Sequence, residues 1–345
     1  MSISSWITRP FRRQPTLAGL TPQRLPLHLL WRQVWSMANL DAAFDWLGAQ
    51  TDDAGANSDV WDYRRHWEAR RAALSGELQR ETFRFQPARI VTIRTEAGDW
   101  ERREVRAAED RLVIRALAQV LQPTLGAVLS PRCTHLKGHG GLPGAVRETQ
   151  DWLAAHPGQH VIKSDVQGFY AHIDPVILAE QLRYLLPHEP ALHRLLWAFL
   201  RRTVEDGGRY SDCERGLPLG AALSPLLGAV YLSPLDALGA REGFYRRYMD
   251  DWVWVLPKRQ GLRRALKDQS AVLQALRVTM HPDKTFIGPV ARGSTFSGST
   301  AGPPACGCRT PAGHGGMRSS RGFMSRVRRR NALRGIWPGG SGGRG

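Results

Sequence analysis

The chain has 345 residues, of which 42% are hydrophobic, and its 48 Lys and Arg against 31 Asp and Glu give a net charge of +17. This length and composition allow a sizeable core and fit one multi-lobed unit better than several independent modules. The positive charge is typical of proteins that bind nucleic acid, and binding through phosphates is then expected to weaken with salt.

The first 60 residues are predicted to form an N-terminal helical extension. An arm that contains Pro and Arg leads into residues 27–47, whose apolar spacing indicates a helix. A polar loop over 50–59 separates it from residues 61–78, where charged and apolar positions again alternate at helical spacing. We therefore expect one helix in each of these two segments.

The next elements are predicted to be two strands and a helix. Residues 83–93 and 100–105 have strand character, and Ala97-Gly98-Asp99 forms a turn between them. Residues 111–121 have helical spacing, and Pro123 is expected to stop that helix.

Three acidic residues follow or join predicted strands. An apolar run leads into Asp165, which indicates a strand that ends at this residue. Asp250 and Asp251 lie between two extended-looking apolar runs, which predicts a β-hairpin with both carboxylates at its tip. If the first strand pairs beside the hairpin, the three carboxylates form a metal site, because hard oxygen ligands suit Mg²⁺. The alternatives are a helix cap at Asp165 and a solvated turn at the doublet.

Between these acids the sequence predicts helices over 175–204 and a flexible loop from Gly216 to Pro225 that leads into a further helix. The apolar run at 226–232 is flanked by Ser and Pro and is too short to span a membrane. Another helix is predicted at 262–276. We therefore expect a soluble protein and, because no cleavable leader opens the sequence, a cytoplasmic one.

These segments resemble the motifs of bacterial reverse transcriptases of the group II intron, retron and diversity-generating lineage. Motif A is matched by Asp165 with Phe169 and Tyr170, motif B by Gly216 to Pro225, and motif C by Tyr248 to Asp251. Upstream, the segments from Asp110 to Val113 and from His135 to Gly141 resemble the fingers of these enzymes, so the resemblance covers about residues 60 to 290.

The resemblance implies an α+β right-hand polymerase fold. Fingers are expected at 61–158, and a palm with motifs A to D, an antiparallel sheet backed by helices, is expected at 159–291. The segment at 292–345 is rich in Gly, Pro, Ser and Arg, a composition that seldom folds, and it stands where the family has a helical thumb. We therefore expect a basic tail of low order and a missing or degraded thumb.

A shift of codon phase offers an explanation for that tail. Reading from Gly293 in another phase permits Phe-Asp-Phe-Leu-Gly, which is how the family usually continues after motif D. We therefore hypothesise a frameshift, which the nucleotide sequence decides. Cys306 and Cys308 in this segment lack a second spaced pair, and Cys133 and Cys213 stand alone, so neither zinc nor a disulfide is expected.

The resemblance also implies a metal site and a nucleotide pocket. Two Mg²⁺ ions, or Mn²⁺, would be held by Asp165, Asp250, Asp251 and the backbone carbonyl of Val166. Tyr170, beside Phe169, would lie beneath the incoming sugar and exclude a 2′-hydroxyl by its volume. Without motif A it would simply be a core tyrosine.

Further residues are expected to contact substrates. Gly220 would let backbone approach the nucleotide or template closely, with Ser224 and Pro225 beside the nucleic acid. Lys284 resembles the motif D lysine near the departing pyrophosphate, although a surface lysine is nearly as good an interpretation. Lys137 either follows the template backbone or decorates a turn.

Arginines of the fingers are the candidates for gripping the triphosphate, since a planar guanidinium pairs bidentately with phosphate oxygens. The sequence does not choose among the three of them: Arg102, Arg103 and Arg106.

The function implied is an RNA-directed DNA polymerase that adds dNTPs to a DNA or RNA primer on an RNA template, for a mobile element, a retron-like unit or antiviral defense. One alternative is a truncated relic that binds RNA without chemistry. A weaker alternative is an RNA-dependent RNA polymerase, against which Tyr170 argues. No membrane is expected as a partner, and the sequence does not determine the oligomeric state.

Overall fold

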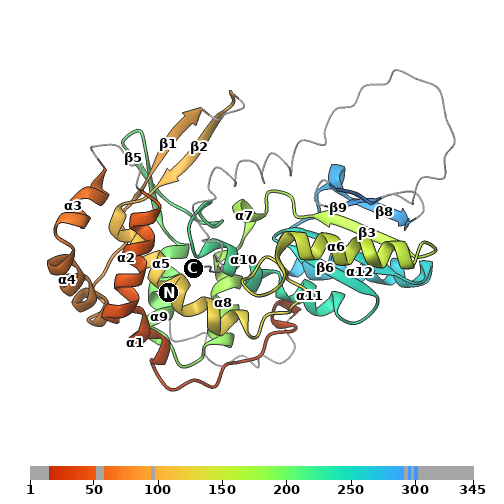
Figure 1. Ribbon diagram of the computed structural model, residues 1–345, viewed down its shortest axis with the longest axis horizontal. Coiled ribbons are helices and arrows are strands. Elements are labelled where there is room, and N and C mark those ends of the chain that lie inside the picture. Colours follow the sequence, from red (N-terminus) through yellow and green to blue (C-terminus); the bar gives the residue numbers. More distant parts are fainter. Residues whose placement is uncertain (1–14, 52–57, 95–97, 291–293, 297–298, 302–345) are drawn as a thin grey trace, which may run out of the picture.

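The computed structural model describes residues 15–51, 58–94, 98–290, 294–296 and 299–301. The fold is α+β, as predicted, with two separate four-stranded sheets among helices. Figure 1 shows the N-terminal helices gathered at one end of the long axis, one sheet at the other end, and a hairpin of the second sheet projecting between them.

Each of the two helices predicted near the N-terminus is a pair of shorter helices. Residues 27–47 contain α1 (Leu29–Val34) and most of α2 (Met37–Ala49), and residues 61–78 span parts of α3 (Asp59–Arg65) and α4 (Trp67–Gln79). The first break lies at Ser36, whose hydroxyl accepts a hydrogen bond from the Asn39 N–H at 3.4 Å and so caps α2. The second break lies at His66, where the backbone leaves the helical region.

Helix α5 (Ala108–Gly126) runs through Pro123, so the prediction that this proline ends the helix is wrong. The buried stripe of the helix continues past it to the fully buried Leu125, and the Ala127 N–H donates to the Pro123 carbonyl at 3.3 Å. Burial of the apolar face thus outweighs the hydrogen bond that proline removes.

The fingers sheet consists of β1 (Ala88–Arg94), β2 (Trp100–Val105), β4 (Thr203–Asp206) and β5 (Arg209–Asp212), in the order β2-β1-β4-β5. Strand β1 pairs antiparallel with β2 but parallel with β4.

Two boundaries in this sheet differ from prediction. The strand predicted from residue 83 begins only at Ala88, because Phe83 and Phe85 stack edge to face at the core instead of joining the ladder. The helices predicted over 175–204 are α8 (Pro175–Leu185) and α9 (Pro190–Leu200), and the last two positions of that range belong to β4.

The palm sheet consists of β3 (His160–Asp165), β6 (Phe244–Tyr248), β7 (Asp251–Leu256) and β8 (Phe286–Pro289), in the order β6-β7-β3-β8. All of its pairings are antiparallel, as predicted. The predicted strand at Asp165 and the predicted hairpin at Asp250 and Asp251 are therefore confirmed.

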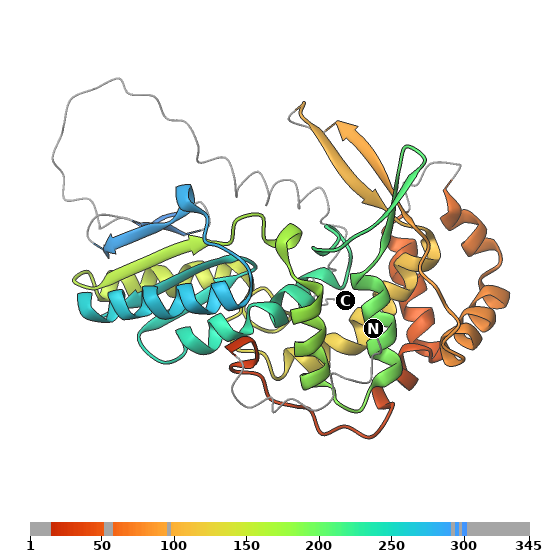
Figure 2. The same cartoon turned by 180° about the vertical axis from the view of Figure 1, so that it is seen from behind.

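Helices cover both faces of the palm sheet. Helix α6 (Gly141–Ala155), which the sequence analysis did not anticipate, lies over one face in Figure 1, and α12 (Arg259–Ala275) lies over the other face in Figure 2. Because side chains alternate along a strand, Val253 and Val255 face the α6 side, whereas Trp252 and Trp254 face the main core.

The apolar segment after motif B forms α10 (Ser224–Tyr231) and α11 (Ser233–Gly239), both largely buried in the core. Within the described ranges, no helix combines the length and the apolar character that crossing a bilayer requires.

The main core runs from Leu17 in the short η3 helix (Pro15–Leu17) to Val278 beside the palm. It is continuous across the expected boundaries at 60 and 158, which stay predictions.

The predicted tail lies mostly outside the described residues. Its described part forms a short antiparallel pair, β9 (Ser294–Phe296) with β10 (Ser299–Ala301). The predictions of low order, of a missing thumb and of a frameshift, together with Cys306 and Cys308, concern residues outside the described ranges.

Candidate active site

The palm sheet places two of the three predicted carboxylates directly opposite each other. Asp165 is the last residue of β3, and its register partner is Asp251, the first residue of β7. On the neighbouring pair, the Val166 N–H donates to the Asp250 carbonyl at 3.2 Å. Asp165 and Asp251 therefore occupy a non-hydrogen-bonded position, where facing Cβ atoms approach to about 4.5 Å. The alternative of a helix cap at Asp165 is not seen, since Gly168 is the N-cap of α7 (Phe169–His172).

Both carboxylates are buried and incompletely paired. Asp165 is 7% exposed and Asp251 is 8% exposed, and the Oδ1 atom of each is buried without a hydrogen-bond partner within the described part of the chain. Burial raises the pKa of Asp251 to about 7, and the charges of Asp165 and Asp250 add to that increase, while Lys163 and Lys284 oppose it. This clustering of negative charge is held in place by the fold and would be relieved by a cation.

The donor chemistry fits a divalent metal ion. Oδ1 of Asp165 and Oδ1 of Asp251, both buried and without a partner in the part of the chain that the structure describes, are the ligand type that Mg²⁺ prefers. Asp250 lies in the turn between β6 and β7, half-buried and close enough for its charge to act on Asp251. Among the described residues, however, no group of three or more His, Cys, Asp or Glu side chains converges tightly enough to hold an ion. The fit therefore rests on the Asp165 and Asp251 pair.

Lys284 lies in this site, on the short helix η4 (Pro282–Lys284). Its Nζ lies 2.7 Å from Asp165 Oδ2, in an ion pair in which the lysine is 38% exposed. The backbone just before η4 is also bonded to β3, because the His281 N–H donates to the Asp165 carbonyl at 2.8 Å. Lys284 thus occupies one face of the carboxylate pair, where it partly neutralises the negative charge.

Motif A and motif B are joined through Tyr170. The Leu217 N–H donates to the Tyr170 carbonyl at 2.7 Å, and the Tyr170 hydroxyl donates to Met249 Sδ at 3.5 Å. Gly216 has a φ of +86°, and a Cβ there would lie 2.9 Å from the Tyr170 carbonyl oxygen, so only glycine fits this approach. The ring of Phe169 packs edge to face against Tyr170. The structure therefore places Tyr170 between the motif B loop and the motif C turn.

The remaining motif B residues have different surroundings. Ser224 is buried, and its hydroxyl donates to the Pro218 carbonyl at 2.7 Å, so this side chain shapes the loop. Gly220 has a φ of +82° at an exposed position with open space around it. Pro225 offers its carbonyl to His135 at 3.1 Å. Lys137 is exposed in the glycine-rich loop before α6.

The three candidate fingers arginines differ in exposure. Arg102 and Arg103 are exposed on β2, and Arg102 forms an ion pair with Asp206 of β4. Arg106 is buried with its guanidinium 2.8 Å from Glu104, a carboxylate that it shares with Arg202. Arg102 and Arg103 are therefore the two that the fold presents to solvent.

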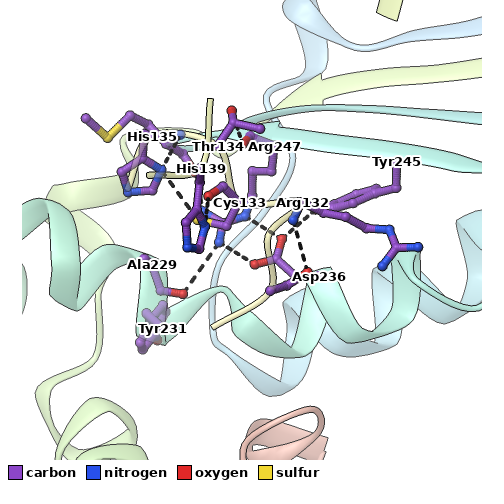
Figure 3. A network of polar contacts seen from close by, with 12 residues as sticks. Arg132, Cys133, Thr134, His135, His139, Ala229, Tyr231, Asp236, Tyr245 and Arg247 are labelled. Atoms are coloured by element: carbon purple, nitrogen blue, oxygen red, sulfur yellow. Dashed lines mark hydrogen bonds and ion pairs between the residues drawn. The ribbon is translucent and has the colours of Figure 1, made fainter. Parts of the chain in front are cut away.

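A polar network that the sequence patterns do not predict lies beneath the motif C turn (Figure 3). Arg247 of β6 is fully buried and donates to both carboxylate oxygens of Asp236 on α11, at 2.7 and 2.5 Å. Tyr245 also donates to Asp236, at 3.1 Å. His135 binds the turn itself, since it accepts from the Met249 N–H at 3.1 Å. No sequence pattern signals these pairs, because they join a loop, a helix and a strand.

Lys163 was also missed, although the alternation of side chains offered a signal. It precedes Asp165 by two positions on β3, so both side chains lie on the same face of the sheet. Its charge is the strongest influence that lowers the pKa of Asp251. Lys163 thus contributes positive charge to the carboxylate cluster.

Comparisons with known proteins show the family to which the chain belongs. A family model described as reverse transcriptase (RNA-dependent DNA polymerase) matches residues 102–299. Protein YkfC of Escherichia coli (strain K12) is 23% identical, in a match that covers 83% of this chain and 86% of that protein. Two solved structures, a partial Cas6-RT-Cas1–Cas2 complex and a Cas6-RT-Cas1–Cas2 complex, match 70% of this chain with 19% identity and a TM-score of 0.43. The match covers 42% of the first of those chains and 26% of the second, so this chain spans less than half of either.

Proposed function

Because the chain belongs to the reverse transcriptase family, we propose that it is an RNA-directed DNA polymerase that adds dNTPs to a primer 3′-hydroxyl on an RNA template. The observation that carries this proposal is the register of Asp165 opposite Asp251, each with a buried oxygen that has no hydrogen-bond partner among the described residues. Nucleotidyl transfer concentrates negative charge on a triphosphate and an attacking oxygen, and divalent cations neutralise that charge. A pair of carboxylates fixed in this way would hold such cations.

The proposed roles follow from the placement of the side chains. Asp165 and Asp251, with Asp250 and the Val166 carbonyl, would hold two divalent cations. Bound there, Mg²⁺ or Mn²⁺ would neutralise the triphosphate and lower the pKa of the primer 3′-hydroxyl. Lys284, which pairs with Asp165 in this structure, would turn to the departing pyrophosphate when cations take its place.

Binding of the nucleotide is proposed to involve the motif A aromatics and the fingers. Tyr170, held between motif B and Met249, would limit the space beneath the sugar. Arg102 and Arg103, exposed on β2, would bind triphosphate oxygens in preference to the buried Arg106.

The test is primer extension by the purified full chain. A primed RNA template, labelled dNTPs and Mg²⁺ are supplied, and extension is expected that disappears in Asp250→Ala. A matched control is Asp45→Ala, which removes an exposed carboxylate from α2, away from the palm. If the intact chain binds RNA but never extends the primer, the chain is the catalytically inactive relic and the proposal is wrong.

The choice of sugar tests the remaining alternative. With Tyr170 in place, we expect deoxynucleotides to be incorporated in strong preference to ribonucleotides. Tyr170→Val should reduce that preference, because it removes ring volume from the pocket. Equal incorporation of both sugars by the intact chain would instead support an RNA-dependent RNA polymerase.

A further inference from the structure

The motif C turn contains a residue in an uncommon backbone conformation. Met249, which precedes Asp250, has a φ of +59°, in the left-handed region that side chains other than glycine seldom adopt. Such a conformation persists only where the surroundings fix it. The contacts of the two Met249 peptide groups therefore decide where the carboxylates that follow them lie.

Both polar groups of Met249 have side-chain partners. Its N–H donates to His135 Nδ1 at 3.1 Å, and its carbonyl accepts from Arg247 Nη1 at 2.5 Å. Arg247 is itself fixed by the buried Asp236. The turn is thus held from one side by a buried ion pair of the palm and from the other by an imidazole that comes from a loop more than a hundred residues earlier.

The chain before His135 explains how the imidazole reaches the turn. Cys133 forms a parallel bridge with Arg247, at the edge of β6. In this bridge the Arg247 N–H donates to the Arg132 carbonyl at 2.9 Å, and the Thr134 N–H donates to the Arg247 carbonyl at 2.8 Å. Because two backbone bonds fix the register, His135 necessarily follows at the end of β6, next to the turn.

The partners of His135 also determine its tautomer. The Pro225 carbonyl, 3.1 Å from Nε2, can only accept, so Nε2 carries the proton. The Met249 N–H can only donate, so Nδ1 is the acceptor. The neutral imidazole therefore connects the start of the motif B helix to the motif C turn, and its ring lies edge to face with Tyr248 at a centroid distance of 6.0 Å.

We propose that His135 is a positioning residue for the polymerase reaction: through Nδ1 it holds the Met249 peptide in its left-handed conformation and so sets the direction of the carboxylates that follow. This inference rests on the proposed function, because it assigns a role within that reaction. The bond to Pro225 orients the ring, and the bond to Met249 carries the effect on the carboxylates.

Two variants separate the two bonds. In His135→Asn the side-chain oxygen falls where Nδ1 lies and can still accept from Met249, but the reach to Pro225 is lost. In His135→Gln the side-chain amide can still donate to Pro225, but the acceptor for Met249 is lost. We expect kcat of primer extension to fall about 10- to 100-fold in His135→Gln and in His135→Ala, as for other misplaced reacting groups, and less than about threefold in His135→Asn. The KM for dNTP should change little in all three.

Hydrogen exchange at the Met249 amide provides a readout that does not need activity. We expect this amide to exchange about tenfold faster or more in His135→Gln and His135→Ala, and at the rate of the unaltered chain in His135→Asn. Thermal melting of each variant shows whether it folds. The proposal is overturned if the Asn and Gln variants lose kcat in equal measure, or if Met249 exchange is the same in all of the chains. If the unaltered chain has no polymerase activity, the proposed function fails, and exchange at Met249 alone decides whether His135 holds the turn.

Discussion

The palm and the fingers each contain an ion pair between an arginine and an aspartate, and the two pairs differ sharply in burial. Every residue of the palm strand β7 is buried, whereas every residue of the fingers strand β5 is exposed. In the palm, the Arg247 and Asp236 side chains are 0% and 1% exposed, while in the fingers the paired Arg102 and Asp206 side chains are 62% and 53% exposed. The Arg247 and Asp236 pair is thus a fixed support, whereas the Arg102 and Asp206 pair is a solvated contact.

The two ion pairs differ in how well they tolerate substitution of one partner. A buried ion pair cannot lose one partner without leaving a charge in the interior, whereas an exposed pair exchanges its partner for water at little cost. The Arg247 and Asp236 pair is therefore suited to hold a fixed geometry, and Arg102 of the fingers remains able to leave Asp206 for a phosphate.

The largest effect is expected from Asp251→Asn, which tests whether the buried carboxylate serves chemistry or stability. Primer extension should fall about ten-thousandfold, or ~5 kcal/mol in transition-state stabilisation, because an amide is a poor ligand for the divalent cations. The free energy of unfolding should not fall, because Oδ1 is buried without a partner in the described part of the chain. Extension assays and urea unfolding of the same preparations measure both, and a large loss of stability would assign the residue a structural role.

The next effect concerns the buried ion pair. Asp236→Ala leaves the Arg247 guanidinium alone in the interior, so we expect the free energy of unfolding to fall by about 3–5 kcal/mol. Urea unfolding followed by circular dichroism gives the value. A loss as small as that of an exposed pair would mean that water reaches Arg247, and the contrast between the two sheets would then disappear.

A pH titration tests whether a buried carboxylate outside the palm also affects the free energy of unfolding. Asp110 at the start of α5 is fully buried, accepts from the Gln86 N–H at 3.1 Å, and has a pKa that burial raises to about 7 from a usual value of 3.8. Between these two pH values the folded chain holds one more proton than the unfolded chain, so the free energy of unfolding falls as pH rises through this window, by up to about 1.4 kcal/mol per pH unit.

The control for that titration is Asp110→Asn, which keeps the acceptor for the Gln86 N–H and removes the titrating group. Unfolding of both chains is measured between about pH 4 and pH 8, a range that covers the interval between the unfolded and the folded pKa of Asp110. The difference in free energy of unfolding between the unaltered chain and Asp110→Asn should change steadily with pH between the two pKa values. A flat difference would show that Asp110 is ionised in the folded chain throughout.

The smallest effect is expected from the fingers pair. Asp206→Ala should change the free energy of unfolding by about 0–1 kcal/mol, and less at high salt, because both side chains are exposed. Arg102→Ala should be equally mild for stability but should raise the KM for dNTP if Arg102 binds the triphosphate. An unchanged KM would leave Arg103 as the fingers arginine to examine.

The palm was predictable from sequence because its signals are local. The apolar runs on either side of Asp250 and Asp251 are continuous in the chain, so the hairpin followed from strand patterns. Helix α5 was misjudged because the helical propensity at Pro123 is local, whereas the burial of Leu125 depends on tertiary packing. The sequence singled out the three acidic residues as candidate metal ligands and the resemblance suggested a role for Tyr170, and these roles stay predictions.

The supports of the site were not predictable, for a related reason. His135 and Met249 are separated by more than a hundred residues, and Asp236 lies on a helix while Arg247 lies on a strand. A side chain that acts through such a contact has no periodicity of its own. The parallel bridge between Cys133 and Arg247 brings the loop that contains His135 to the motif C turn, and this bridge is a feature of the tertiary structure.

The parallel pairing of β1 with β4 has a consequence for how the protein is made. Ala88 and Arg89 pair with Val204 and Glu205, and the whole of β3 is translated between them. Until the ribosome has produced β3 and the helices that precede β4, one edge of β1 has unpaired backbone groups, which can associate with another nascent chain. A fragment that stops before Thr203 should therefore aggregate, because it cannot complete the fingers sheet.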